Sequence, residues 1–201
     1  MARLRTHTNP LNIRHRFEKD WINSINKTSF LDIEIGCGRG VFLRDWAKQN
    51  LNRTIVGIEV RKSIVDILQD RIKNDDLPNA TIIHGNGHYF LQDGVENNTI
   101  DRLFIFHPDP WFKKRHHKRR VINHEFLNIA AKKLKPEGKL CISTDVKELW
   151  EEIQSNLKNA NFKEVKDEYF WENQYNTHWH TFSEKENRSL YFESFSVKNF
   201  R

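Results

Sequence analysis

The chain has 201 residues, of which 37% are hydrophobic and 30% charged, and its formal net charge is +6. That length suits one domain with its own core and is short for two, and no apolar run approaches the ~20 residues that span a bilayer. The N-terminus also lacks the apolar segment of a signal peptide. We therefore expect a single domain over residues 1–201, in the cytoplasm and without a membrane partner.

The predicted elements alternate between strand and helix from residue 30 onward. Continuous apolar strands separated by amphipathic helices indicate a parallel sheet covered on both faces, which is a doubly wound α/β fold. Strands are expected at residues 30–36, 53–60, 80–85, 100–106 and 138–144, and helices at 41–49, 62–73, 88–93, 121–134 and 146–160. In such a fold, ligands bind outside the carboxyl ends of the strands.

The first strand runs into Asp-Ile-Glu-Ile-Gly-Cys-Gly-Arg-Gly, with glycines at positions 36, 38 and 40. Glycines at a strand-to-helix turn let the backbone approach a ligand closely and leave helix amides facing it. The third glycine comes one position too early for a nicotinamide-binding fingerprint. Glu34, two residues before the first glycine, instead gives a pattern that resembles the first motif of S-adenosylmethionine-dependent methyltransferases. A purely structural turn is the alternative.

The next two strands each end in a polar residue. Glu59 closes the second strand about 20 residues after the glycines, where an acid can accept hydrogen bonds from ribose hydroxyls. Asn86 follows the third strand between two glycines, where its amide can pair with an adenine edge. For Glu59 the alternative is an exposed residue that leads into the next helix, and for Asn86 it is ordinary turn chemistry.

The strand at residues 100–106 is followed by His-Pro-Asp-Pro-Trp-Phe and then by a basic run. Pro108 and Pro110 restrict the backbone on both sides of Asp109 and so fix the direction of its carboxylate. Residues 113–120 hold six Lys or Arg and no acid, which suits an RNA backbone, while Trp111 and Phe112 offer flat surfaces to a base. A solvated charged face and core packing of the two aromatics are the alternatives.

The net charge is concentrated in two segments. Residues 1–20 hold five Lys or Arg against two acids, which together with residues 113–120 leaves the rest of the chain mildly acidic. This localisation indicates a polyanionic partner. His116 and His117 have no Cys or carboxylate beside them at ligand spacing, so we expect no metal site. Two cysteines, Cys37 and Cys141, cannot form a disulfide framework or a zinc site and are expected to pack in the interior.

Two further segments carry polar residues at the spacing of a helix cap. Asp145 follows the strand at 138–144, and Glu148 stands three residues later. Thr181 and Glu184 have the same spacing. Either pair could be a capping box at the start of a helix and nothing more.

In combination, these motifs resemble the bacterial tRNA (guanine-N7-)-methyltransferases, class I S-adenosylmethionine-dependent enzymes, over nearly the whole chain from residue 30. The most specific match is Phe-His-Pro-Asp-Pro-Trp-Phe-Lys-Lys-Arg-His-His-Lys-Arg-Arg-Val, residues 106–121. The resemblance implies a Rossmann-like fold with a mostly parallel seven-stranded sheet, a catalytic core over 30–201 and a basic N-terminal arm and leading helix over 1–29. It also implies methyl transfer to N7 of the guanosine at position 46, in the tRNA variable loop.

The resemblance also implies roles for particular residues, namely cofactor contact, catalysis, substrate binding and RNA binding. Cofactor contacts are expected at Glu34, Gly36, Gly38, Gly40, Glu59, Asn86 and Asp109, and Asp109 matches the active-site acid. Substrate contacts are expected at Lys113, Asp145, Thr181, Phe182, Ser183 and Glu184, and RNA contacts at Arg115, His116, His117, Lys118, Arg119 and Arg120.

The chain departs from the family pattern at Asn86, where Asp is usual, and at Ser183, where an aromatic is expected. Two other functions remain as alternatives: a methyltransferase acting on an exocyclic amine of an RNA base, and a non-catalytic tRNA-binding protein that has kept the fold. The sequence does not favour either a monomer or a homodimer.

Overall fold

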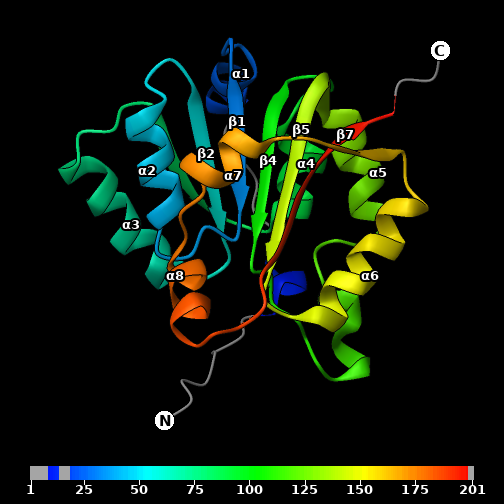
Figure 1. The fold of residues 1–201 in the computed structure, drawn as a ribbon. Coiled ribbons are helices and arrows are strands. Elements are labelled where there is room, and N and C mark those ends of the chain that lie inside the picture. Colours follow the sequence, from blue (N-terminus) through cyan, green and yellow to red (C-terminus); the bar gives the residue numbers. More distant parts are fainter. Residues whose placement is uncertain (1–8, 14–18, 199–201) are drawn as a thin grey trace.

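The structure, a computed structural model, describes residues 9–13 and 19–198. Within them, seven strands form one sheet in the order β3-β2-β1-β4-β5-β7-β6 (Figure 1). The strands are β1 Leu31–Ile35, β2 Thr54–Glu59, β3 Ala80–His84, β4 Ile100–Phe106, β5 Leu134–Thr144, β6 Phe162–Val165 and β7 Tyr191–Val197. Strands β1 to β5 pair in parallel, whereas β7 is antiparallel to both β5 and β6. The predicted doubly wound, mostly parallel seven-stranded fold is confirmed.

Helices cover both faces of the sheet. The helices are α1 Lys19–Asn26, α2 Val41–Gln49, α3 Lys62–Asn74, α4 Gly87–Gly94, α5 His124–Lys133, α6 Lys147–Lys158, α7 Glu168–Asn173 and α8 His178–Lys185, with short 3₁₀ turns η1 Pro10–Asn12 and η2 Lys114–Arg119. Helices α2, α3 and α7 contribute to one buried cluster, and α1, α4, α5 and α6 contribute to the other. None of these helices is long and apolar enough to cross a membrane.

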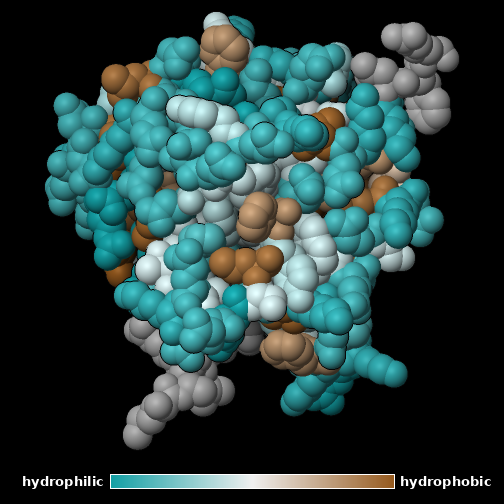
Figure 2. All heavy atoms as spheres, in the orientation of Figure 1, coloured by the Kyte–Doolittle hydropathy of each residue, from teal (hydrophilic) through white to brown (hydrophobic). Residues whose placement is uncertain are grey.

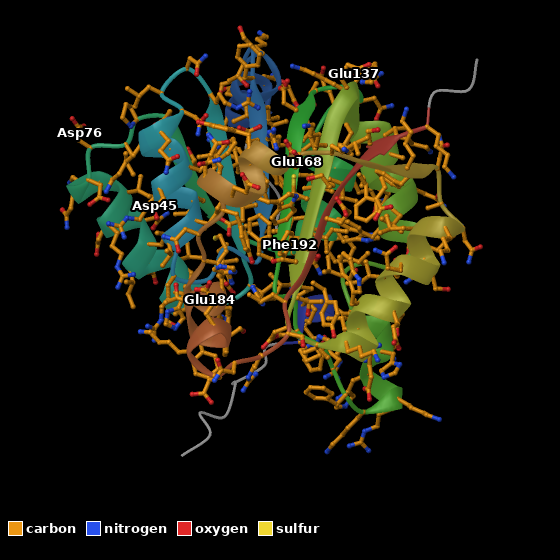
Figure 3. All side chains as sticks on the ribbon, viewed as in Figure 1. Asp45, Asp76, Glu137, Glu168, Glu184 and Phe192 are labelled. Atoms are coloured by element: carbon orange, nitrogen blue, oxygen red, sulfur yellow. The ribbon has the colours of Figure 1, made fainter. Side chains whose placement is uncertain are left out.

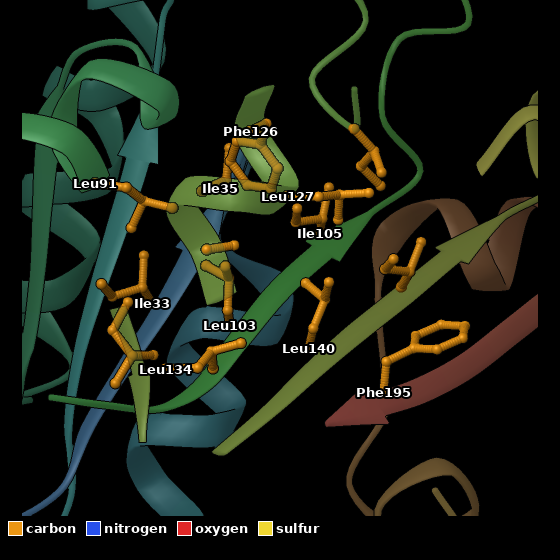
Figure 4. Close-up of a cluster of buried hydrophobic side chains, with 14 of the residues drawn as sticks. Ile33, Ile35, Leu91, Leu103, Ile105, Phe126, Leu127, Leu134, Leu140 and Phe195 are labelled. Atoms are coloured by element: carbon orange, nitrogen blue, oxygen red, sulfur yellow. The ribbon is translucent and has the colours of Figure 1, made fainter. Parts of the chain in front are cut away.

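Strand β1 shows how the sequence produces both layers. Successive side chains of a strand point to opposite faces, so Leu31, Ile33 and Ile35 enter the cluster that α4 and α5 cover (Figure 4). Asp32 and Glu34 consequently face the side of α2. There Asp32 is fully buried and accepts hydrogen bonds from Arg53 and from Trp46 Nε1, the latter at 2.8 Å. The strand therefore carries the core on one face and polar groups on the other.

The surface is mostly hydrophilic on the face that Figure 2 shows, with paler and brown spheres near its centre. In the same orientation, Phe192 of β7 is labelled at that position (Figure 3). Its ring lies 5.0 Å from that of Trp171, and 44% of Phe192 is exposed. These aromatics cover the middle of the sheet where α7 crosses it.

Several boundaries differ from the sequence prediction, and the largest difference is at β5, which begins at Leu134 and not at residue 138. Helix α5 begins at His124, not at residue 121, because Asn123 is its N-cap and accepts a 3.0 Å hydrogen bond from Phe126 N. Elements β6, α7, α8 and β7 were not predicted individually, and β6 is only four residues long. Most of the predicted N-terminal arm lies outside the described residues.

Candidate active site

The candidate site lies where the parallel strands end. Strands β1 and β4 are neighbours although β2 and β3 lie between them in the chain, so the strand order reverses there, and crevices at such points bind ligands. In Figure 1 the arrowheads of β1, β2 and β4 point to the edge of the sheet near α8 and η2. Glu59, Asn86, Asp109 and Asp145 each stand at or just after the end of a strand on this edge.

The glycine loop after β1 requires glycine for two different reasons. Gly36, Gly38 and Gly40 have φ of +77°, +53° and +67°, in the left-handed region that favours glycine. A Cβ on Gly40 would lie 2.3 Å from Leu68 Cδ1, so this residue also allows α3 to pack closely. A Cβ on Gly36 would meet nothing within 4 Å. The space beside Gly36 is therefore open to a ligand.

Glu34 lies beneath this loop and is only 4% exposed. Burial raises the pKa of its carboxyl to about 8, and repulsion from Glu59 adds to this, while a hydrogen bond from the Leu43 backbone opposes it. Among the described residues, Glu34 Oε2 is buried and has no hydrogen-bond partner. Such an atom normally finds a partner, so Glu34 is available to a ligand.

The raised pKa of Glu34 predicts a pH dependence of folding. The carboxyl titrates near its ordinary value of 4.5 when unfolded and near 8 when folded, so the folded state holds a proton that the unfolded state releases. Its contribution to stability is fully present below about pH 4.5 and is lost as the pH rises through about 8. We expect the free energy of unfolding of the wild type, measured relative to Glu34→Gln in urea titrations, to fall across this window. A difference that is constant with pH would contradict the assignment.

Glu59 is buried, and its carboxylate already accepts four hydrogen bonds. Gly38 N donates to Oε2 at 3.0 Å, while Arg61 donates from its backbone N and Nε to Oε1, at 3.0 and 2.9 Å, and from Nη2 to Oε2 at 2.9 Å. A carboxylate offers about four lone-pair positions, so a ribose hydroxyl has to displace the Arg61 side chain. Interaction with Glu59 and, more weakly, with Asp109 raises the pKa of Arg61 against the opposing effect of burial.

Asn86 uses both ends of its amide within the chain. Its Oδ1 caps α4 by accepting from His88 N at 2.8 Å, and its Nδ2 donates to the Pro10 carbonyl, also at 2.8 Å. The turn-chemistry alternative is therefore correct for Oδ1. The Nδ2 group is held by η1, to which Pro10 belongs.

Asp109 stands in a loop whose two ends have an unusual backbone. His107 and Trp111 have φ of +45° and +43°, which is uncommon for residues with large side chains and costs roughly 1–3 kcal/mol each. Asp109 is half-buried between them. Trp111 is buried, whereas Phe112 is 69% exposed. The packing alternative thus holds for Trp111, and only Phe112 presents an open ring.

His107 anchors the first end of this loop in a buried polar network. Its Nε2 lies 2.9 Å from Tyr175 Oη, which donates to Ser143 Oγ at 2.7 Å, and its Nδ1 lies 3.5 Å from Asp145 Oδ1. The His107 backbone N–H also donates to the Ser143 carbonyl at 2.8 Å. The ends of β4 and β5 are therefore tied to each other and to the segment before α8.

The side chain of Asp145 is buried and accepts hydrogen bonds from two other residues of the chain. Its Oδ2 accepts from Ser183 Oγ at 3.1 Å and from Arg188 Nη1 at 3.0 Å, and its side chain is 2% exposed. Burial opposes ionisation, but the hydrogen bonds from His107 and Arg188 outweigh it and hold the pKa of Asp145 well below its usual value. Asp145 and Ser183, both expected as substrate contacts from the family resemblance, are thus in direct contact.

Neither predicted pair forms a capping box. The N-cap of α6 is Val146, which makes no side-chain cap, and the N-cap of α8 is Thr177, whose Oγ1 accepts from His180 N at 2.9 Å. Thr181 and Glu184 are therefore inside α8, where both are exposed, and Figure 3 shows Glu184 on this helix. Their prediction as substrate contacts is compatible with this exposure. Phe182 lies under the Arg188 guanidinium, 5.1 Å from it.

The basic segment divides by exposure. Its exposed members are Lys113, Lys114, Arg115 and Lys118, and its half-buried members are His116, His117 and Arg119. Arg119 lies over the Trp111 ring at 4.9 Å. Arg120 is only 7% exposed and bonds within the protein. The RNA-facing prediction fits the exposed members, and the buried Arg120 needs another explanation.

Sequence reasoning missed three residues of the site: Arg61, His107 and Tyr175. Arg61 and His107 lie beside or within motifs that were recognised, so the sequence could have indicated that they belong to the site. Tyr175 contacts Ser143 from 32 residues away, and nothing local marks it.

The doubly wound fold is one that solved methyltransferases share. The backbone resembles the crystal structure of the 16S rRNA methyltransferase KamB with a TM-score of 0.69 at 14% identity, covering 92% of this chain and 96% of that one. At this identity the likeness concerns the fold alone.

The sequence comparisons identify the family within this class. A family model described as "Putative methyltransferase" matches residues 28–194. The tRNA (guanine-N(7)-)-methyltransferase of Prochlorococcus marinus (strain MIT 9515) is 35% identical over 83% of this chain and 84% of its own length. The enzyme of the same name from Nitrosococcus oceani is 36% identical over 80% of this chain and 65% of its own length. The chain belongs to the tRNA (guanine-N7-)-methyltransferase family.

Proposed function

We propose that this protein transfers a methyl group from S-adenosylmethionine to N7 of the guanosine at position 46 in the tRNA variable loop, and that it does so in the cytoplasm. The observation that carries the proposal is the position of Asp109. This carboxylate stands on a restrained loop just after the end of β4, at the same edge of the sheet as Glu59 and directly before an exposed basic segment. The names of the family's relatives support the choice of base, atom and RNA.

The pocket suits the proposed cofactor on the grounds of its own polar groups. Glu34 offers a buried oxygen without a partner, and the open space beside Gly36 can take an atom close to the backbone. Glu59 and Asn86 would hold the ribose and adenine once Arg61 and η1 release them. When bound, S-adenosylmethionine supplies an electrophilic methyl group on a cationic sulfur.

The reaction asks little acid–base chemistry of the protein. Guanine N7 carries a lone pair and no proton, so the protein has to position the base and stabilise the positive charge that develops on the ring. Asp109 can do both, because a carboxylate accepts hydrogen bonds from the guanine imino and amino groups and offsets the charge. No cysteine nucleophile is required, and both cysteines are buried.

The tRNA would approach across η2 and α8. Lys113, Lys114, Arg115 and Lys118 are exposed and can contact phosphates. The exposed ring of Phe112 can stack on a base, and Thr181 and Glu184 are open to solvent on α8. These features support the proposal that tRNA is the partner.

The test is methyl transfer from labelled S-adenosylmethionine to unmodified tRNA transcripts, with nucleoside analysis of the product. We expect label in 7-methylguanosine, lost when the guanosine at position 46 of the variable loop is replaced. Label in an exocyclic amine would overturn the choice of atom. Binding of tRNA without any methyl transfer, and without cofactor binding in calorimetry, would favour a non-catalytic protein.

A further inference from the structure

Arg120 is chemically separate from the basic segment that it ends. Lys114, Arg115 and Lys118 are exposed, but only 7% of Arg120 is exposed. Its Nε donates to the Pro110 carbonyl at 2.7 Å, and its Nη1 pairs with Glu152 of α6. A guanidinium that is buried and already bonded on two of its nitrogens is poorly placed to meet an RNA phosphate.

Helix α6 also contacts the backbone two residues after Arg120. Asn156 Nδ2 donates to the Ile122 carbonyl at 3.0 Å. Glu152 and Asn156 are four residues apart and so share one face of the helix. Because α6 packs in the core through Leu149, Ile153 and Leu157, this face is a fixed platform for residues 120–122.

The loop that Arg120 reaches has a restrained start and a strained end. At its start, His107 is held by Tyr175 and Ser143. At its end, Trp111 has a φ of +43°, a conformation that persists only when the surroundings impose it. Arg120 bonds to the carbonyl immediately before Trp111, and that carbonyl belongs to the residue next to Asp109.

We propose that Arg120 is a positioning residue, which Glu152 orients and which fixes the Pro110–Trp111 backbone so that Asp109 faces the reacting base. Arg120 acts through this backbone and not by contact with RNA. The inference rests on the proposed function for the role of Asp109. The mechanical part, that Arg120 and Glu152 restrain residues 107–113, does not depend on that function.

The discriminating variant is Arg120→Lys. Lysine keeps the positive charge, so most of a phosphate contact would survive, but its single ammonium cannot reproduce the planar fork that serves Pro110 and Glu152 together. We expect kcat at saturating tRNA and cofactor to fall on the order of 10- to 100-fold, as small misplacements of reacting groups do. The Kd for tRNA and its salt dependence should remain at the wild-type values.

Glu152→Gln is the second variant, since it removes the orienting charge at a half-exposed position that tolerates substitution. We expect kcat to fall with no loss of tRNA affinity. Glu151→Gln removes the same charge from the neighbouring, exposed position on α6 and is the matched control. Lys118→Ala is the comparison for a true phosphate contact, and should weaken tRNA binding and reduce the salt slope by about one.

Hydrogen exchange of the peptide that covers residues 107–113 gives a readout without activity. We expect faster exchange in Arg120→Lys and Glu152→Gln, and wild-type exchange in Glu151→Gln. If the wild type methylates no tRNA, the proposed function fails. The exchange rates of the variants still show whether Arg120 and Glu152 restrain residues 107–113.

Three outcomes would overturn the inference. Arg120→Lys could weaken tRNA binding and lower the salt slope with kcat unchanged, which would make Arg120 a phosphate contact. Both variants could keep wild-type kcat and exchange, which would mean that the loop holds its shape without them. If Arg120→Lys does not fold, Glu152→Gln decides alone, and its equality with Glu151→Gln would end the proposal.

Discussion

Replacing Asp109 with Ala should abolish measurable turnover while tRNA still binds. Electrostatic groups aimed at charge that develops in a transition state are typically worth 10²–10³-fold in kcat, and Asp109 is the carboxylate that the β4 loop presents at the proposed site. The RNA contacts lie on the exposed residues after it, so the Kd for tRNA should change little. Single-turnover methyl transfer and a filter-binding titration measure the two quantities separately.

Glu137→Ala is a suitable control for this experiment. Glu137 is an exposed carboxylate at the opposite edge of the sheet (Figure 3), so its loss changes the net charge equally without touching the site. It should behave as the wild type. An Asp109→Ala enzyme that still turned over at a comparable rate would remove Asp109 from the mechanism.

Replacing Glu59 with Gln should weaken cofactor binding by at least about 10- to 100-fold, since each hydrogen bond to a charged group is worth about 1.5–3 kcal/mol. The amide keeps the shape of the carboxylate but loses its charge and turns one acceptor into a donor. That donor would face either Arg61 or the Gly38 N–H, both of which need an acceptor. Calorimetry with S-adenosylmethionine gives the change in Kd.

Glu59→Gln should leave tRNA binding intact, because Glu59 is only 3% exposed and so is not itself available to the RNA. Thermal unfolding checks that the variant is folded. Cofactor affinity equal to that of the wild type would show that Glu59 serves only to hold Arg61 and the glycine loop.

The sequence predicted where a residue lies in the fold when that location depends only on its position along one strand or helix. Strand and helix periodicity placed Glu34, Glu59, Asn86 and Asp109 at one edge of a parallel sheet, because the carboxyl ends of parallel strands coincide.

What the sequence did not indicate depends on contacts between distant segments. Asp145 becomes buried only because Arg188, 43 residues later, and Ser183, 38 residues later, bond to it. Arg120 is turned away from the exposed basic residues by its bonds to the Pro110 carbonyl and to Glu152 of α6. In each case the residue type matched its motif, and the partner that determines its role could not be read from local spacing.

The antiparallel strand β7 has a consequence for how the protein is made. It lies between β5 and β6, so a chain still being synthesised lacks an inner strand of its sheet until residue 197 has emerged. Until then β5 offers an unpaired edge, which is a site of aggregation, and Asp145 lacks Ser183 and Arg188. Prematurely terminated chains would carry the glycine loop and Asp109 without a finished sheet. The site around Asp145 is therefore incomplete until β7 and the segment before it have joined the sheet.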